Sequence, residues 1–244
     1  MGFNLAWEPI LLSLVRILTS LRTLVSLSEN HLIRKRNLKM KIAIIGTGNV
    51  GGALATKWSK AGHDIFLGVR DTFSFKGQSL LNNANTSAHP IKEAVQHAEI
   101  VLIATPAPHA IDVAKSLGDT DGKIIIDSMN IVMGRGPEGY TNTAEAILDN
   151  TQTNDVIKCF NTTGFNNMVD SNYGDQNLDL FCAGESSEAK QLVQGLAKDA
   201  GFGQCYDIGE NDKFYLMEQF AWFWINLAMF QGHGREIGFK LMKR

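Results

Sequence analysis

The sequence predicts an α/β protein with a doubly wound, mainly parallel sheet and a small, mostly helical C-terminal domain. From residue 40 onward, short apolar runs rich in β-branched residues alternate with helical patterns, as in folds with right-handed crossovers. A glycine-rich turn joins the first apolar run to the first helix. The 244 residues are 44% hydrophobic and 20% charged, enough for one ordinary domain and a small one. The formal net charge of -2 gives no sign of nucleic-acid binding.

Expected strands and helices alternate along the chain as far as residue 168. We expect a nucleotide-binding domain over 40–168 and a C-terminal domain over 169–244. Strands are predicted at 42–45, 64–69, 101–104, 123–126, 156–160 and 178–182. Helices are predicted around 53–58 and at 91–98, 109–117, 143–148, 189–200 and 214–230. Ser187 is a candidate N-cap for the helix at 189–200, and the glycine-rich loop 131–141 is either a lid or a tolerated insertion.

The predicted helix at 214–230 is unusually rich in aromatic residues. It also contains Glu218, Gln219 and Asn226, so it is a poor membrane span. A helix that is apolar on most sides has to be buried, and we expect it in the core or at a homodimer interface. Its aromatic rings are also suited to form one wall of a pocket for a flat ring.

The glycine-rich turn predicts a dinucleotide site. A buried strand leads into Gly46-Thr47-Gly48-Asn49-Val50-Gly51, which opens a helix in a unit of about 30 residues. Gly46 permits the tight turn, Gly48 lets the backbone approach a pyrophosphate, and Gly51 allows the helix to pack closely on the strand. The helix N-terminus then offers free N–H groups to the phosphates.

The end of the second strand indicates which cofactor is used. An NAD enzyme has an acidic residue there for the ribose 2′-hydroxyl, but this position is occupied by Val69. Arg70 follows and can pair with a 2′-phosphate. If the strand register differed by two residues, Asp71 would occupy the acidic position at the strand end, and NAD would be favoured instead of NADP.

Residues 1–39 differ in composition from the rest of the chain. They contain six basic and two acidic residues, net +4, which leaves -6 for the remainder. One interpretation is a basic amphipathic leader that targets an organelle or lies on a membrane surface. The other is that Met40 is the true start, because Met-Lys followed by Ile-Ala-Ile-Ile is a common opening of dinucleotide-binding chains.

Motifs for other chemistry are missing from the sequence. Cys159, Cys182 and Cys205 form no CxxC and cannot all pair, so we expect free thiols in a reducing compartment, the cytoplasm. We see no clustered metal ligands, no HExxH and no Ser-His-Asp order, and we expect no metal site. His109 is the one histidine expected near the cofactor, although a surface helix start is its simpler role.

The sequence resembles the family of coenzyme F420-dependent NADP reductases. Pyrroline-5-carboxylate reductases and STEAP metalloreductases share this N-terminal domain. The resemblance is carried by residues 40–51, Gly68-Val69-Arg70, Thr105-Pro106 and Lys158-Cys159-Phe160-Asn161-Thr162. The F420 reductases hold the 2′-phosphate with Ser-Arg-Arg, of which this chain keeps only the middle arginine.

The resemblance implies roles for further residues. Thr47, Asn49 and Val50 would line the pyrophosphate and ribose. Thr105 and Pro106 would border the route toward the nicotinamide, and Asn161 would lie near its ring. Thr105 could instead cap the following helix, and Asn161 could satisfy turn backbone.

The expected function is hydride transfer from NADPH to a planar acceptor, either F420 or a flavin that could in turn reduce a ferric chelate. Alignment matters more than a strong acid or base when hydride passes between two cofactors. Two alternatives remain: reduction of a small imine or carbonyl compound, and binding of NADP(H) by a non-catalytic sensor.

Overall fold

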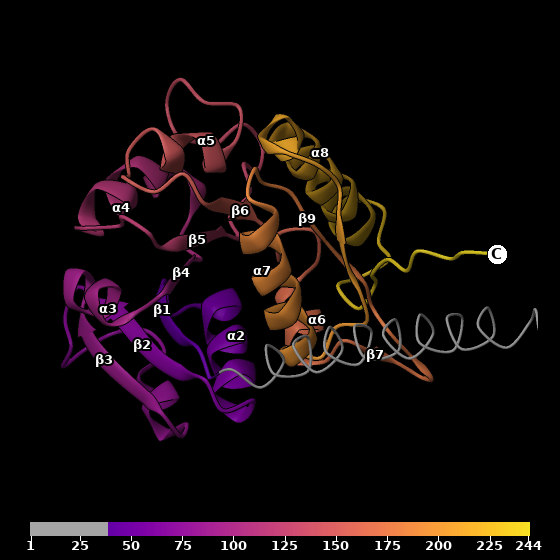
Figure 1. Ribbon diagram of the computed structural model, residues 1–244. Coiled ribbons are helices and arrows are strands. Elements are labelled where there is room, and N and C mark those ends of the chain that lie inside the picture. Colours follow the sequence, from indigo (N-terminus) through magenta and orange to yellow (C-terminus); the bar gives the residue numbers. More distant parts are fainter. Residues whose placement is uncertain (1–38) are drawn as a thin grey trace, which may run out of the picture. The chain divides into compact units, whose positions relative to one another are not determined.

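Six parallel strands form the central sheet, in the order β3-β2-β1-β4-β5-β6 (Figure 1). The structure is a computed structural model that describes residues 39–244, which form one compact unit. Both interpretations of the basic N-terminal segment concern residues that, apart from Lys39, lie outside this described range. The strands are β1 (Lys41–Ile45), β2 (Asp64–Val69), β3 (Thr86–Pro90), β4 (Ile100–Ile103), β5 (Ile124–Asp127) and β6 (Val156–Lys158).

Helices cover both faces of the sheet, as predicted for a doubly wound fold. One face packs against α2 (Asn49–Lys60) and α7 (Ser187–Asp199), where Trp58 Nε1 donates to the carbonyl of Leu196 at 2.9 Å. The other face packs against α3 (Ile91–His97), α4 (Ala110–Ser116) and α5 (Thr143–Leu148). The predicted fold class is confirmed.

The edge strand β3 was not predicted. Its sequence, Thr-Ser-Ala-His-Pro, has no apolar alternation, because this strand lies at the sheet edge and stays partly exposed. It is fixed by pairing with β2, with His89 opposite Gly68 and Pro90 opposite Val69. Tertiary pairing therefore produces a strand where the local sequence gives no signal.

The C-terminal region packs against the far edge of the sheet. Ala183 forms a two-hydrogen-bond bridge with Lys158 of β6, which covers that edge. The preceding strand β9 (Leu180–Cys182) pairs with β10 (Cys205–Asp207). The remaining elements are the short helices η1 (Gln78–Asn82), η2 (Ala107–His109), α6 (Phe165–Val169) and η3 (Asn211–Lys213), the hairpin β7 (Asn172–Tyr173) and β8 (Gln176–Asn177), α8 (Phe214–Ile225) and the π-helical turn η4 (Asn226–Phe230).

Two local predictions for this region need correction. Ser187 is the first residue of α7, and Ser186 is its N-cap, whose hydroxyl accepts from the backbone N–H of Ala189 at 3.1 Å. The aromatic helix is buried on one face only, because only one side of α8 packs on the unit. Its other side carries an aromatic stripe of exposed residues: Tyr215, Leu216, Trp222, Phe223, Met229 and Phe230. Among residues 39–244, no helix combines the length and apolar character that crossing a membrane requires.

Candidate functional site

The glycine turn after β1 is sterically restricted at two of its positions. Gly46 has φ +104°, and a Cβ there would lie 2.6 Å from the carbonyl oxygen of Ala104. A Cβ on Gly51 would lie 2.0 Å from the carbonyl oxygen of Gly46. The turn therefore packs against β4 and against its own helix, as the motif requires.

Gly48 differs, because a Cβ there would meet no atom of the described residues within 4 Å. Its φ of −78° is also open to any residue. Gly48 is the N-cap residue of α2, whose first turn has no side-chain cap and no acidic residue. An uncapped helix start with free space in front of it fits an anion such as a pyrophosphate.

The loop after β2 lies against the glycine turn. The hydroxyl of Thr47 donates to the carbonyl of Lys76, and a Cβ on Gly77 would lie 2.5 Å from the carbonyl oxygen of Thr47. These contacts place Lys76 and Gly77, in the loop that starts at Arg70, against the glycine turn.

Arg70 is exposed directly after β2, and it makes no hydrogen bond or ion pair within residues 39–244. Asp71 instead faces its own loop, where its Oδ1 accepts from the N–H groups of Phe73 at 2.9 Å and Ser74 at 3.3 Å. Val69 is buried at the strand end. This register leaves Arg70 available for a phosphate and engages the Asp71 carboxylate elsewhere.

The carboxyl ends of β4, β5 and β6 are joined by side chains. Thr105 Oγ1 donates to Met129 Sδ at 3.3 Å and so does not cap the following helix, whose N-cap is the exposed Pro106. Asn130 Nδ2 donates to the carbonyl of Asn161 at 2.7 Å, and Asn161 Nδ2 donates to Asn130 Oδ1 at 2.9 Å. The strand ends therefore form one connected edge.

Asn161 also links this edge to α8. Its Nδ2 lies 3.2 Å from the carbonyl of Met217, while its buried Oδ1 has no hydrogen-bond partner in the structure. The preceding residue, Phe160, has φ +62°, a conformation that is costly for a bulky side chain. An orphaned amide oxygen beside a strained residue is typical of a functional position.

A buried ion network lies beneath this edge, and the sequence analysis did not predict it. Lys158 Nζ lies 2.7 Å from Asp127 Oδ2, 2.9 Å from Glu218 Oε1 and 3.0 Å from Thr143 Oγ1, and the lysine is fully buried. Burial alone would lower the pKa of Lys158, but the two carboxylates outweigh it and raise that pKa. Glu218 Oε2 accepts from the N–H of Ile131 at 2.8 Å, so the network connects α8 to the start of the loop 131–141.

The fold places the predicted site residues along one edge of the sheet, since the carboxyl ends of parallel strands meet there. The glycine turn, Arg70, Thr105, Pro106 and Asn161 all follow strands of that sheet. His109 is exposed at the end of η2. All three cysteines are free, and burial raises the pKa of Cys159, whose Sγ lies 3.7 Å from Cys205 Sγ.

The strand order and the glycine turn define a Rossmann-type NAD(P)-dependent oxidoreductase fold. Residues 41–131 match the model of the family described as NADP oxidoreductase, coenzyme F420-dependent. The crystal structure of a candidate F420-dependent NADP reductase from Arthrobacter sp. FB24 is 27% identical, with a TM-score of 0.72 over 84% of this chain and 100% of that one.

Two curated relatives match only part of their own length. Metalloreductase STEAP3 of Rattus norvegicus is 24% identical over 162 residues, 66% of this chain and 32% of that protein. Glycerol-3-phosphate dehydrogenase [NAD(P)+] of Thermoanaerobacter sp. (strain X514) is 27% identical over 131 residues, 48% of this chain and 38% of that protein. A reductive aminase from Aspergillus terreus, 18% identical with a TM-score of 0.59 over 80% of this chain and 64% of that one, shares the fold.

Proposed function

We propose that the chain is an NADP(H)-dependent oxidoreductase that transfers a hydride between NADPH and a planar acceptor, either F420 or a flavin. The observation that carries this proposal is a single sheet edge that combines three features. These are an uncapped helix start, three neutral strand ends, and the Arg70 side chain, which has no partner among residues 39–244. NADPH supplies the hydride when it is bound. The protein then has to hold the two rings in register and exclude water.

The Gly48 backbone and the first turn of α2 would hold the pyrophosphate, with Thr47, Asn49 and Val50 lining it. Arg70 would hold the 2′-phosphate, for which its guanidinium offers paired donors. Thr105 and Pro106 would border the route to the nicotinamide, and Asn161 would offer its Oδ1 to the carboxamide or ring edge. The open space at Gly48 supports this arrangement, because nothing in the protein itself requires a glycine there.

The chemistry of the strand ends supports the proposed acceptor class. Residues 104–106, 128–130 and 159–162 contain only apolar, hydroxyl, amide and thiol side chains. Lys158 and Asp127 lie directly below but are fully buried and paired with each other. Reduction of an imine or a carbonyl compound needs a proton donor beside the substrate, and these residues offer no strong one. Hydride transfer between two flat rings does not need one.

A substitution at Arg70 tests the cofactor assignment. Arg70→Ala should weaken NADPH binding by about 10–100-fold, the value of a charge-assisted phosphate contact, while NADH binding changes by less than about 2-fold. Titration calorimetry with both nucleotides measures this. Lys60→Ala, an exposed cation at the opposite end of α2, is the matched control and should leave both affinities unchanged. Equal losses for both nucleotides in Arg70→Ala would contradict the assignment.

An acceptor assay tests the reaction. NADPH absorbance is followed anaerobically on addition of F420, then of FMN with a ferric chelate, then of a cyclic imine. Turnover with F420 or FMN supports the proposal, and reduction of the chelate would indicate a metalloreductase activity. Turnover with the imine alone would support the alternative. Tight NADPH binding without any turnover would favour a sensor.

We also propose a homodimer formed through the aromatic stripe of α8 and η4. Its members recur at a spacing of seven residues (215, 222 and 229; 216, 223 and 230), which places them on one side of a helix. Sedimentation should show a dimer, and Leu216→Glu should shift it to a monomer. A wild-type monomer would refute this.

The free thiols support a cytoplasmic location.

A further inference from the structure

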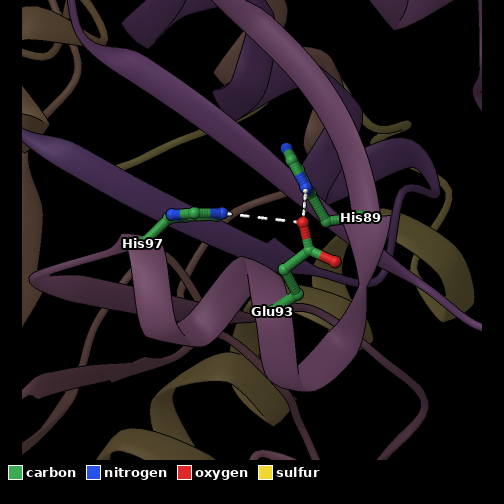
Figure 2. A group of neighbouring side chains, drawn as sticks. All are labelled: His89, Glu93 and His97. Atoms are coloured by element: carbon green, nitrogen blue, oxygen red, sulfur yellow. Dashed lines mark hydrogen bonds and ion pairs between the residues drawn. The ribbon is translucent and has the colours of Figure 1, made fainter.

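Three potential metal ligands converge at the corner where β3 meets α3 (Figure 2). His89 lies near the end of β3, and Glu93 and His97 are one turn apart on α3. His89 Nδ1 lies 2.8 Å from Glu93 Oε1, and His97 Nε2 lies 3.6 Å from the same oxygen. The ligand atoms all lie within 4.8 Å of one another. This cluster was not predicted from the sequence, although the spacing His-x3-Glu-x3-His is present there.

We propose that His89, Glu93 and His97 bind one divalent transition-metal ion of the Zn²⁺ class. Zinc–ligand bonds of about 2.0–2.2 Å in tetrahedral geometry place two ligand atoms roughly 3.3 Å apart. The two measured separations, 2.8 and 3.6 Å, lie on either side of that value. Small side-chain rotations therefore suffice to admit the ion between these atoms.

The surrounding residues orient both imidazole rings. His89 Nε2 lies 2.8 Å from Ser87 Oγ, so a metal on Nδ1 leaves Nε2–H to donate to this hydroxyl. Phe66 of β2 stacks on His97 with ring centroids 5.2 Å apart and lies against His89 at 5.8 Å. A ligand pair that is already oriented loses less side-chain entropy when it binds the ion.

The donor set indicates which ion binds. Two imidazoles and one carboxylate suit zinc, cobalt or nickel better than magnesium or calcium, which prefer oxygen ligands. Glu93 and His97 are exposed, so water can complete the coordination. The cluster lies on the sheet face that packs against α3, opposite the face of α2 and its glycine turn. It is therefore a separate site, and its ion would connect the edge strand to the next helix.

Calorimetric titration of the chelator-treated, untagged full chain with Zn²⁺ tests the proposal. We expect one ion per chain and a rise in the thermal midpoint with zinc. Glu93→Gln and His97→Gln should each weaken binding by at least about 10-fold and abolish the rise. His233→Gln, a change at an exposed histidine outside the cluster, is the matched control and should bind like the wild type. Circular dichroism checks that the variants are folded.

Cobalt distinguishes this site from the three free thiols. Co²⁺ bound to imidazole and carboxylate gives weak d–d absorption without a thiolate charge-transfer band, and that is the expected spectrum. A strong charge-transfer band would assign the metal to the cysteines and overturn the proposal. Absence of zinc binding by the wild type, or unchanged binding in both cluster variants, would also overturn it.

Discussion

Replacing Lys158 with methionine removes the cation of the buried network and leaves most of the volume of its side chain. Asp127 and Glu218 then remain beside each other, without the ammonium group that lies 2.7 and 2.9 Å from their oxygens. Asp127 keeps its hydrogen bonds from the Thr143 hydroxyl and the Met129 N–H. Glu218 keeps its bond from Ile131. Neither carboxylate has solvent to compensate for the loss, because both are buried.

The expected cost follows from this burial. Removing one partner of a buried ion pair costs about 3–5 kcal/mol, because the remaining charge is uncompensated. For a chain of this size, 1 kcal/mol lowers the thermal midpoint by roughly 2–4 °C. Lys158→Met should therefore lower the midpoint by about 6–20 °C.

Calorimetric or circular-dichroism melting of a double-mutant cycle provides the assay. Glu218→Gln removes one of the two carboxylate charges that Lys158→Met leaves without a cation. The double variant Lys158→Met/Glu218→Gln should therefore be more stable than Lys158→Met alone. A loss below about 1 kcal/mol for Lys158→Met, at the level of an exposed ion pair, would refute the reasoning. Purely additive losses in the double variant would also refute it, because the two side chains would then not interact.

Three further predictions concern the glycine turn, the C-terminal tail and alkaline pH. Gly48→Ala should leave the melting temperature unchanged within a few degrees yet weaken NADPH binding at least about 10-fold, because the pyrophosphate would occupy that space. Gly51→Ala should impair folding itself, as melting curves would show. Burial would raise the pKa of Asp179, but hydrogen bonds from Leu241 N–H and Lys240 lower it. The stabilisation that the ionised carboxylate provides is therefore lost only as pH falls below the ordinary aspartate pKa near 3.9. Asp179→Asn should cost about 1.5–3 kcal/mol of stability at pH 7 and remove that acid sensitivity in denaturant titrations. The raised pKa of Lys158 means that its contribution is complete at neutral pH and is lost only as pH rises above about 10.4, which melting in alkaline buffers measures.

The elements predicted best from the sequence are those whose environment is uniform. β1 and β4 are buried on both faces, so their residues are almost all apolar and their bounds agree with the prediction to within one or two residues. β3 was missed because its pairing with β2 stabilises it, while its own side chains are partly exposed and show no apolar pattern. Ser186 and Ser187 are adjacent, and the sequence does not distinguish which of the two caps α7.

The geometry of the candidate site was predictable where it depends on the backbone and not where it depends on distant partners. The glycines and Arg70 follow directly from strand ends, so a local motif locates them. Lys158 lies in an apolar strand, and its partners are 31 residues earlier, at Asp127, and 60 residues later, at Glu218. No local pattern connects these three residues, because only the completed sheet and the docked α8 bring them together.

The same network connects α8 to the strand ends at which the proposed site lies. Glu218 and the carbonyl of Met217 are adjacent on α8, and they bond to Lys158 and Asn161, two residues that follow one another closely at the end of β6. The position of α8 over the strand ends is thus fixed by buried bonds. We expect acceptor choice to depend on α8 and the loop 131–141 rather than on the sheet. Exchanging the residues of α8 that face the strand ends should therefore change which acceptor is reduced and leave NADPH affinity intact. Loss of both acceptor reduction and NADPH affinity in the same variant would instead indicate that the acceptor binds to the sheet itself.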